Sequence, residues 1–168
     1  MSQPLVLIGP SGAGKSSVVK ILTEKHGYTL IKTVTTRPQR DASDTDHEFI
    51  TPEEFAKRKN AGAFFGMLDA FGEQYGLPKF NPADTIVLNL RAPAIPELRA
   101  GFPDAVVVEI DAPIEILKQR LEARGSSERF DPELLGKEIA FGRSLTNHCF
   151  DSSKLSAEEI AKAIIALY

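Results

Sequence analysis

The segment that most restricts how this chain folds covers residues 9–16 and reads GPSGAGKS. It matches the pattern G-x-x-x-x-G-K-[ST] at every fixed position. The apolar run LVLI (5–8) comes directly before it and is typical of a strand buried on both faces. We expect a helix to follow over residues 15–25. The chain is therefore predicted to begin with a buried strand, a glycine-rich turn and a helix.

The residue types of this turn suit the binding of phosphate groups. Glycine adopts positive φ angles and has no Cβ, so backbone N–H groups can face an anion. Lys15 adds a positive charge for the β- and γ-phosphates, and the helix directs the positive end of its dipole toward them. Ser16 offers a hydroxyl to Mg²⁺. The turn predicts a nucleoside triphosphate with Mg²⁺, bound through Gly9, Ser11, Gly12, Ala13, Gly14, Lys15, Ser16 and Ser17. It does not distinguish a kinase from a GTPase or from a protein that only binds nucleotides.

Further strands and helices follow the turn. The runs TIVLNL (85–90) and AVVVEI (105–110) are apolar and rich in β-branched residues, as expected of central parallel strands. Strands that alternate with helices predict an α/β fold in which helices flank a parallel sheet. We expect a last core strand over residues 147–151, in which Cys149 packs as a small hydrophobic residue.

Capping side chains mark three helix starts, at Thr51, Asp131 and Ser156, and apolar residues at helical spacing predict another helix over 113–124. Prolines and glycines interrupt the segment 33–81 at short intervals, and we interpret it as a mixed insertion. The chain has 168 residues, of which 42% are hydrophobic, the length and balance of a single domain.

Charge and cysteine content exclude several classes of protein. The chain has 20 Lys and Arg against 23 Asp and Glu, a formal net charge of -3, so no overall positive field attracts a nucleic-acid polymer. The single Cys149 forms no intramolecular disulfide or thiolate zinc site, which favours the reducing cytoplasm. The first apolar run is too short for a signal peptide or a membrane span. We expect a cytoplasmic protein, a monomer or a homodimer, with no membrane partner.

The segment TVTTRPQR (33–40) is a candidate for a second anion site. Arg37 and Arg40 lie three residues apart and next to hydroxyl side chains, and a fork of two guanidinium groups suits a phosphate. A solvated charged loop is the alternative explanation of the same residues.

Several segments together resemble the guanylate kinase family of nucleoside monophosphate kinases. GPSGAGKSS is similar to its donor-phosphate loop, and TTRPQR, DHEFITPEEF and QYG are similar to its T-T-R-x-x-R, Y-x-F-x-S-x-x-E-F and Y-Y-G elements. IEILKQRLEARG is similar to the family helix that leads into a mobile lid. The resemblance implies a P-loop NTPase fold with a core (1–32 and 82–168), an acceptor-binding insertion (33–81) and a short helical lid (about 124–143). It also implies ATP and Mg²⁺ as cofactors and a small phosphorylated acceptor.

The resemblance further implies roles for single residues. Those that match the family's acceptor-phosphate site are Thr33, Arg37, Arg40, His47 and Tyr75. His47 stands at the place of a tyrosine. The implied catalytic residues are Lys15, Arg37 and Arg124, of which Arg124 matches the first arginine of the lid. The second lid arginine falls near Leu135 or Lys137, neither of which matches it, and Arg129 is the candidate to replace it.

Two kinds of departure from the family pattern affect the expected chemistry. The guanine site loses its polar groups, because a glutamate aligns with Gly66, a hydroxyl residue with Leu77 and an aspartate with Arg91. We count Arg91 as an acceptor-binding residue that favours a more anionic acceptor. The third core strand ends in Asn89, where the family usually has an aspartate that organises Mg²⁺ through water. Ser16 is then the only direct metal ligand that the sequence supports.

A smaller branch of the same superfamily, the ribose 1,5-bisphosphate phosphokinases, similarly has R-A-x-x-x-P after the third strand, here residues 91–96. The predicted activity is ATP-dependent phosphorylation of a phosphosugar such as ribose 1,5-bisphosphate or of a nucleoside monophosphate. Two alternatives stay open, a true guanylate kinase that converts GMP to GDP and a non-catalytic module that binds proteins. The intact pair of Lys15 and Ser16 counts against the module. Phe64 is expected in the core of the insertion, whereas Phe65, Met67 and Phe71 fit either a pocket or that core.

Overall fold

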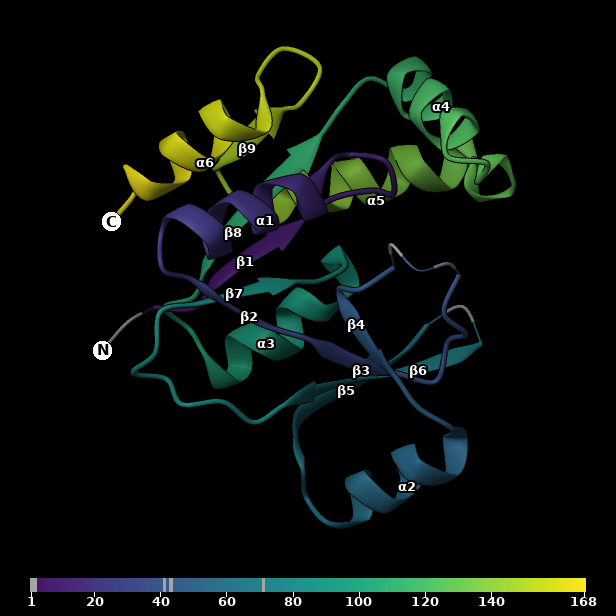
Figure 1. Cartoon of the computed structure of the whole chain (residues 1–168), viewed down its shortest axis with the longest axis vertical. Coiled ribbons are helices and arrows are strands. Elements are labelled where there is room, and N and C mark those ends of the chain that lie inside the picture. Colours follow the sequence, from purple (N-terminus) through teal and green to yellow (C-terminus); the bar gives the residue numbers. More distant parts are fainter. Residues whose placement is uncertain (1–2, 41, 43, 71) are drawn as a thin grey trace.

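The computed structural model describes residues 3–40, 42, 44–70 and 72–168, which form two β-sheets surrounded by helices (Figure 1). The larger sheet has the strand order β2-β7-β1-β8-β9, and its pairings are all parallel. The smaller sheet has the order β4-β3-β6-β5. The strands are β1 (Leu5–Ile8), β2 (Thr29–Ile31), β3 (Thr33–Thr35), β4 (His47–Phe49), β5 (Phe64–Ala70), β6 (Glu73–Pro78), β7 (Ile86–Asn89), β8 (Val106–Asp111) and β9 (Cys149–Asp151). The α/β fold with a parallel sheet is confirmed.

Three helices begin where their capping residues predict. Thr51, Asp131 and Ser156 each accept a hydrogen bond from a backbone N–H of the first turn that follows. The α-helices are α1 (Lys15–Lys25), α2 (Pro52–Asn60), α3 (Ile95–Gly101), α4 (Ile114–Ala123), α5 (Pro132–Leu145) and α6 (Ala157–Ile165). Two short 3₁₀ turns, η1 (Ala92–Ala94) and η2 (Ser127–Arg129), complete them.

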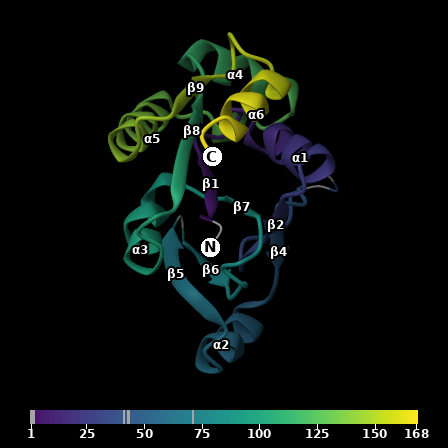
Figure 2. The same ribbon diagram turned by 90° about the vertical axis from the view of Figure 1, so that its left-hand side faces the viewer.

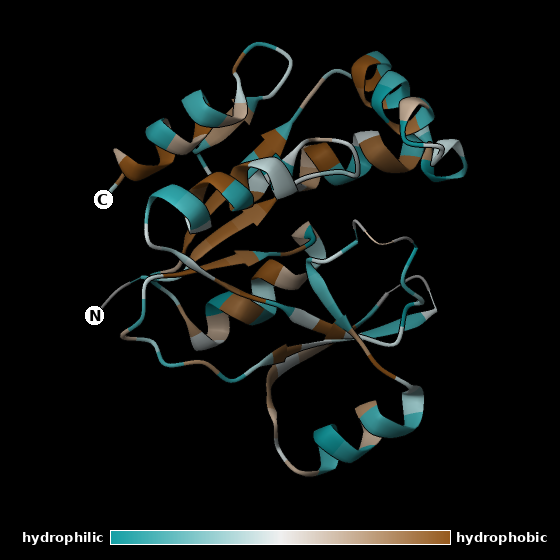
Figure 3. Cartoon of the chain, viewed as in Figure 1, coloured by the Kyte–Doolittle hydropathy of each residue, from teal (hydrophilic) through white to brown (hydrophobic). Residues whose placement is uncertain are grey.

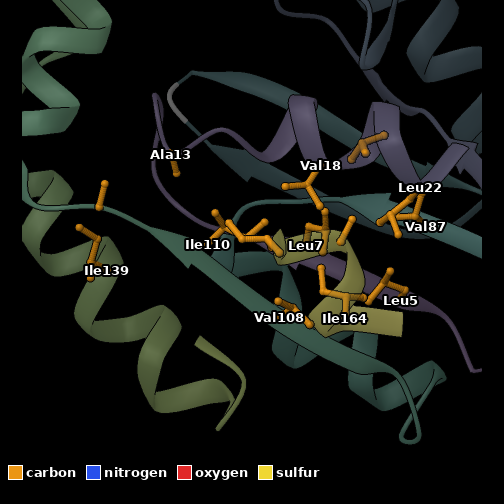
Figure 4. Packing of buried hydrophobic residues seen from close by; sticks show 14 of the residues in the cluster. Leu5, Leu7, Ala13, Val18, Leu22, Val87, Val108, Ile110, Ile139 and Ile164 are labelled. Carbon is orange, nitrogen blue, oxygen red and sulfur yellow. The ribbon is translucent and has the colours of Figure 1, made fainter. Parts of the chain in front are cut away.

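Strand β1 is fully buried because helices cover both faces of the larger sheet. Leu5 and Leu7 belong to a cluster that they share with side chains of α1 and α6, such as Leu22 and Ile164 (Figure 4). Val6 and Ile8 belong to a second cluster, shared with α3. Figure 2 shows α1 and α6 on one side of this sheet and α3 on the other. Alternate side chains of a strand face opposite sides of its sheet, so both faces must be apolar here. The ribbon of β1 and β8 is accordingly hydrophobic, whereas α2 is largely hydrophilic (Figure 3).

The smaller sheet is formed within residues 33–78 and lies beside α2 (Figure 1). Its strand β3 follows β2 directly, with Lys32 between them, so the chain passes from one sheet into the other without a turn. Phe55 of α2 is 1% exposed and stacks on Phe64 of β5, with ring centroids 5.0 Å apart. Phe64 is half-buried and packs on this core residue, outside the lining of the cavity described below, as its prediction as a core residue of this segment requires.

The expectation that Cys149 packs in the core is wrong. Strand β9 lies at the edge of the larger sheet and pairs only with β8, and the Cys149 side chain is exposed. A strand with one neighbour is covered less completely than a central one, and sequence composition does not reveal which strand takes the edge. In the part of the chain that the structure describes, no helix has the length and apolar character needed to cross a membrane.

Candidate active site

A cavity of about 820 Å³ lies between the glycine-rich turn after β1 and the smaller sheet. The ends of β1 and β7 open into it from one side, and β3, β4 and β6 line it from the other. It brings together most of the residues that the sequence selects, namely Ser11, Lys15, Ser16, Thr33, Arg37, Arg40, His47, Tyr75, Arg91, Arg124 and Arg129. Segments that are far apart in sequence thus meet at one cavity, as expected for a ligand site at the carboxyl ends of parallel strands.

The glycine-rich turn is shaped by close packing against β8. A Cβ on Gly9 would lie 1.9 Å from the carbonyl oxygen of Ile110, so no other residue fits there without moving the backbone. Gly14 has φ 94° and directly precedes α1. Its residue type provides no side-chain cap, so the first-turn N–H groups of α1 are available to an anion.

Lys15 lies at the start of α1 and donates a hydrogen bond to the carbonyl oxygen of Gly9. Burial, and next the charge of Arg91, lower the pKa of Lys15 to about 8, against the opposite effects of Glu138 and Glu109. An amine in these surroundings gains electrostatic stabilisation when a phosphate comes near, because the anion favours its charged form.

Carboxylates hold two of the cavity's arginines in place. Arg37 makes two contacts with Asp44, at 2.8 Å from Nη1 to Oδ2 and 3.3 Å from Nη2 to Oδ1. Arg91 of the turn after β7 is bound by Glu138 of α5 through both of its carboxylate oxygens, each at 2.7 Å. The Arg91 charge is therefore balanced in part, which weakens the argument that it attracts a second anionic group.

The other arginines that line the cavity are Arg40, Arg124 and Arg129, and they form a cationic cluster beside the glycine-rich turn, the P-loop. Arg129 of η2 donates to the Ser11 hydroxyl, so it reaches the donor side of the cavity. Burial, followed by the charges of Arg40 and Arg124, lowers the pKa of Arg129 to about 10. A group of like charges that repel each other in partial burial gains stability when an anion enters. Arg129 thus occupies a position from which it can act for the missing second lid arginine.

Two buried polar atoms face the opposite side of the cavity without a hydrogen-bond partner among the described residues. They are Oγ1 of Thr33 and Nδ1 of His47. The His47 ring contacts that of Tyr75 edge to face, with centroids 6.3 Å apart. Burial, and then the charge of Arg37, lower the pKa of His47 below its ordinary value of 6.5, which favours the neutral ring near pH 7. Buried polar atoms are usually hydrogen-bonded, so atoms that lack a partner and line a cavity indicate a place where a ligand binds.

Four acidic residues of this region were missed by the sequence analysis: Asp44, Asp46, Glu97 and Glu138. Glu97 of α3 lies beside Gly66, where a Cβ would be 3.2 Å from its Oε1, and the same oxygen is 3.4 Å from the N–H of Met67. A carboxylate therefore stands near the position where the family has its guanine-reading glutamate, although another element supplies it. No motif indicated this, because α3 is about 30 residues further along the chain.

Aromatic residues form the remaining wall. The rings of Phe65, Phe80 and Phe102 lie 5.0 to 5.1 Å apart, and Phe65 and Phe102 line the cavity. Met67 also lines it and is 39% exposed. Phe65 and Met67 are thus pocket residues, whereas Phe71 lies outside the described residues. An aromatic cluster of this kind suits an apolar or planar part of a ligand.

Known proteins with similar sequences include ribose 1,5-bisphosphate phosphokinases and guanylate kinases. The ribose 1,5-bisphosphate phosphokinase PhnN of Agrobacterium fabrum is 32% identical over 136 residues, 76% of this chain and 74% of that protein. The guanylate kinase of Symbiobacterium thermophilum is 31% identical over 146 residues, 81% of this chain and 68% of that protein. A bifunctional ribose 1,5-bisphosphokinase-thymidine phosphorylase of Cupriavidus necator is 37% identical over 126 residues, but the match spans only 21% of its length.

The fold has a counterpart among solved structures. The guanylate kinase of Anaplasma phagocytophilum superimposes with a TM-score of 0.74 at 22% identity, over 99% of this chain and 84% of that one. The model of the guanylate kinase family matches residues 1–167, nearly the whole length. The shared motifs, the P-loop fold and this match agree, and the chain belongs to the guanylate kinase family.

Proposed function

We propose that the protein is an ATP-dependent kinase that transfers the γ-phosphoryl group to a small phosphorylated acceptor. The observation that carries the proposal is the cavity itself, which has the P-loop on one side and, on the other, orphaned polar atoms of Thr33 and His47 beside Arg37. A donor and an acceptor bound at these two sides would meet within one cavity, and such positioning is the main requirement of phosphoryl transfer.

Some residues of the cavity position the two substrates, and others stabilise the charge of the group in transfer. Backbone N–H groups of the P-loop and Lys15 hold the donor phosphates, and Arg37 and Arg40 hold the phosphate of the acceptor. Arg124 and Arg129 stabilise the charge of the group in transfer, because both line the space between the two sides. Mg²⁺ neutralises part of the triphosphate charge when bound, and the Ser16 hydroxyl is an oxygen donor of the kind that it prefers. No general base is required.

A phosphosugar such as ribose 1,5-bisphosphate is the preferred acceptor in this proposal. Gly66 and Leu77 provide no polar side chain that could form hydrogen bonds with a base. Relatives named as ribose 1,5-bisphosphate phosphokinases are as similar to this chain as those named as guanylate kinases. GMP is the second candidate, favoured by one observation. The carboxylate of Glu97 beside Gly66 offers a hydrogen-bond acceptor to the N–H groups of a base.

Thermal-shift measurements with each candidate separate these acceptors. A ligand at a hundredfold its dissociation constant adds about 2.7 kcal/mol of stability. We expect ribose 1,5-bisphosphate to raise Tm more than GMP does, and ADP release in a coupled assay to follow the same order. A larger shift and faster turnover with GMP would establish the second candidate instead. Binding of ATP with no turnover on either acceptor would contradict the kinase proposal.

A further inference from the structure

We propose that Asp46 supplies the carboxylate that holds Mg²⁺ in the ATP complex, in place of the residue at the end of β7. This inference rests on the proposed function, because it concerns the metal that accompanies ATP. It adds a metal-positioning residue that belongs to the acceptor side of the cavity and not to the P-loop.

Three elements meet at one carboxylate oxygen. The Ser16 hydroxyl, at the start of α1, donates a hydrogen bond to Oδ2 of Asp46. The side-chain amide of Asn89, at the end of β7, donates to the same oxygen at 2.9 Å. All three residues line the cavity. The hydroxyl that the P-loop offers to a metal therefore already contacts a carboxylate from elsewhere in the chain.

The donor set has the chemistry that Mg²⁺ prefers. Magnesium binds oxygen ligands, usually one or two carboxylates together with phosphates and water. The residue at position 89 is an uncharged amide, so it cannot provide the carboxylate. Among the described residues no group of three or more acidic, His or Cys side chains forms a complete metal site. A metal at Asp46 and Ser16 therefore needs the phosphates of ATP to complete its coordination.

Electrostatics gives a second reason for this assignment. A carboxylate beside the first turn of α1 opposes the binding of a triphosphate, because like charges at short range repel each other. A divalent cation between them reverses the sign of the interaction. Asp46 then makes ATP binding dependent on Mg²⁺. If Asp46 served only to stabilise the start of α1 through its negative charge, its removal would not change the metal dependence of ATP binding.

The position of Asp46 also connects the two sides of the cavity. It precedes His47, the first residue of β4, and β4 pairs with β3, in which Thr33 lies opposite His47. A metal ion held by Asp46 would therefore attach the strand that carries acceptor-site residues to the P-loop. We expect Mg²⁺ with ATP to order the acceptor side as well as the donor.

Calorimetric titration of the full chain with ATP, without acceptor, tests the assignment. We expect Mg²⁺ to strengthen ATP binding to the wild type. In Asp46→Asn the Mg²⁺ concentration that gives half of this effect should rise about 10- to 100-fold, as for other residues that support a metal. ATP affinity in excess EDTA should be unchanged or higher, because a repelling charge has been removed. Asp104→Asn, which removes an exposed carboxylate outside the cavity, is the matched control and should behave as the wild type.

A second readout follows the metal directly. Mn²⁺ in the ATP complex, observed by electron paramagnetic resonance, should bind more weakly to Asp46→Asn and recover affinity when Asn89→Asp is added. If Asp46→Asn loses cooperative unfolding, Asp46→Ser replaces it in both measurements. Equal Mg²⁺ and Mn²⁺ dependence in the wild type and the Asp46 variant would overturn the inference and leave the proposed function standing. A wild-type protein that binds no ATP at any Mg²⁺ concentration would contradict the proposed function as well.

Discussion

The two sides of the cavity are built in different ways. The donor side consists of consecutive residues, 9–16, whose conformation follows from their own glycines and from packing on β8. The acceptor side takes Thr33 from β3, His47 from β4 and Tyr75 from β6, and these meet only because the strands pair in one register. A continuous turn can be recognised in a linear sequence, whereas an assembled site depends on contacts that the sequence does not display.

The two sides also hold their positive charges differently. Lys15 on the donor side contacts a backbone carbonyl oxygen, and its pKa is lowered to about 8. Arg37 on the acceptor side forms an ion pair with Asp44 at 2.8 Å, in which both side chains are mostly buried. An acceptor phosphate must therefore compete with a carboxylate, whereas a donor phosphate meets a poorly solvated amine. We expect donor-side changes to act mainly on turnover and acceptor-side changes mainly on acceptor affinity.

Replacement of Lys15 by alanine should have the largest effect, a loss of about 100- to 1000-fold in kcat. The variant removes the charge that stabilises the phosphoryl group in transfer and leaves the glycines of the turn unchanged. A coupled assay of ADP release at saturating acceptor measures it. Lys20→Ala, an exposed position on α1, is the matched control. If turnover of Lys15→Ala stayed close to that of the wild type, donor-side changes would not act mainly on turnover, and the proposed difference between the two sides would be wrong.

Arg40→Ala should raise the KM for the acceptor about 10- to 100-fold, the effect of losing one charged hydrogen bond, with the KM for ATP unchanged. Arg40 is exposed at the cavity and lies next to the pair of Arg37 and Asp44. Initial rates at varied acceptor and varied ATP separate the two constants. Lys57→Ala on α2 removes a positive charge outside the cavity as a control. A parallel rise in both KM values would show that the two sides are not independent.

The affinity for ATP should fall as the pH rises above about 8, by up to tenfold per pH unit, because Lys15 then loses its proton in the free protein. Below that pH the amine of Lys15 is charged, and its contribution to the ATP affinity should not change with pH. Calorimetric titrations between about pH 7 and 9.5 measure the slope. Lys15→Ala should lack it. A slope that persists in this variant would assign the pH dependence to another group.

The core behind the P-loop provides a test of stability. Both carboxylate oxygens of Glu109 on β8 are buried and lack a hydrogen-bond partner among the described residues, and Oε2 would lie 2.1 Å from a Cβ on Gly142. Burial, and then Asp111, raise the pKa of Glu109 to about 8 from 4.5, while Lys15 acts in the opposite direction. The folded protein thus retains a proton that the unfolded chain loses, so stability falls as the pH rises through this range.

Glu109→Gln should abolish this dependence, because the amide stays neutral at every pH. We expect a Tm several degrees above the wild type near pH 9 and a similar Tm near pH 5. Thermal unfolding at both pH values measures the difference. The control is Glu115→Gln, at an exposed position on α4. A variant that is less stable than the wild type at both pH values would mean that Glu109 is ionised and well paired.

The smallest expected effect compares the helix caps of the two regions. Thr51 caps α2 beside the smaller sheet, and Ser156 caps α6 of the core, each through a hydrogen bond of 3.1 Å. Replacement of either by alanine should cost about 1 kcal/mol. Amide hydrogen exchange should show faster exchange of α2 alone in Thr51→Ala if the smaller sheet opens by itself. Equal acceleration in α6 would show that both regions unfold as one unit.

Much of the donor side could be predicted from the sequence. The strand, the glycine-rich turn and α1 follow from apolar runs, glycines and helix signals within a few residues of each other, and the structure has α1 over the predicted range. The boundaries of β7 and β8 differ by one residue from those expected, and β9 begins two residues later than expected. Local interactions determine such elements, so a linear pattern contains most of the information about them.

What the sequence alone determined is the P-loop between β1 and α1, the alternation of core strands and helices, and a set of candidate phosphate-binding residues chosen through a family pattern. Only the tertiary structure decided which carboxylates join them. Glu138 at Arg91, Glu97 at Gly66 and Asp46 at Ser16 are contacts between segments 30 or more residues apart. Asp44 reaches Arg37 within the connection from β3 to β4. The edge position of β9, which exposes Cys149, was decided in the same way. The physical reason is range: backbone conformation responds to neighbours in sequence, whereas charge pairing and burial depend on distances in space that chain topology sets.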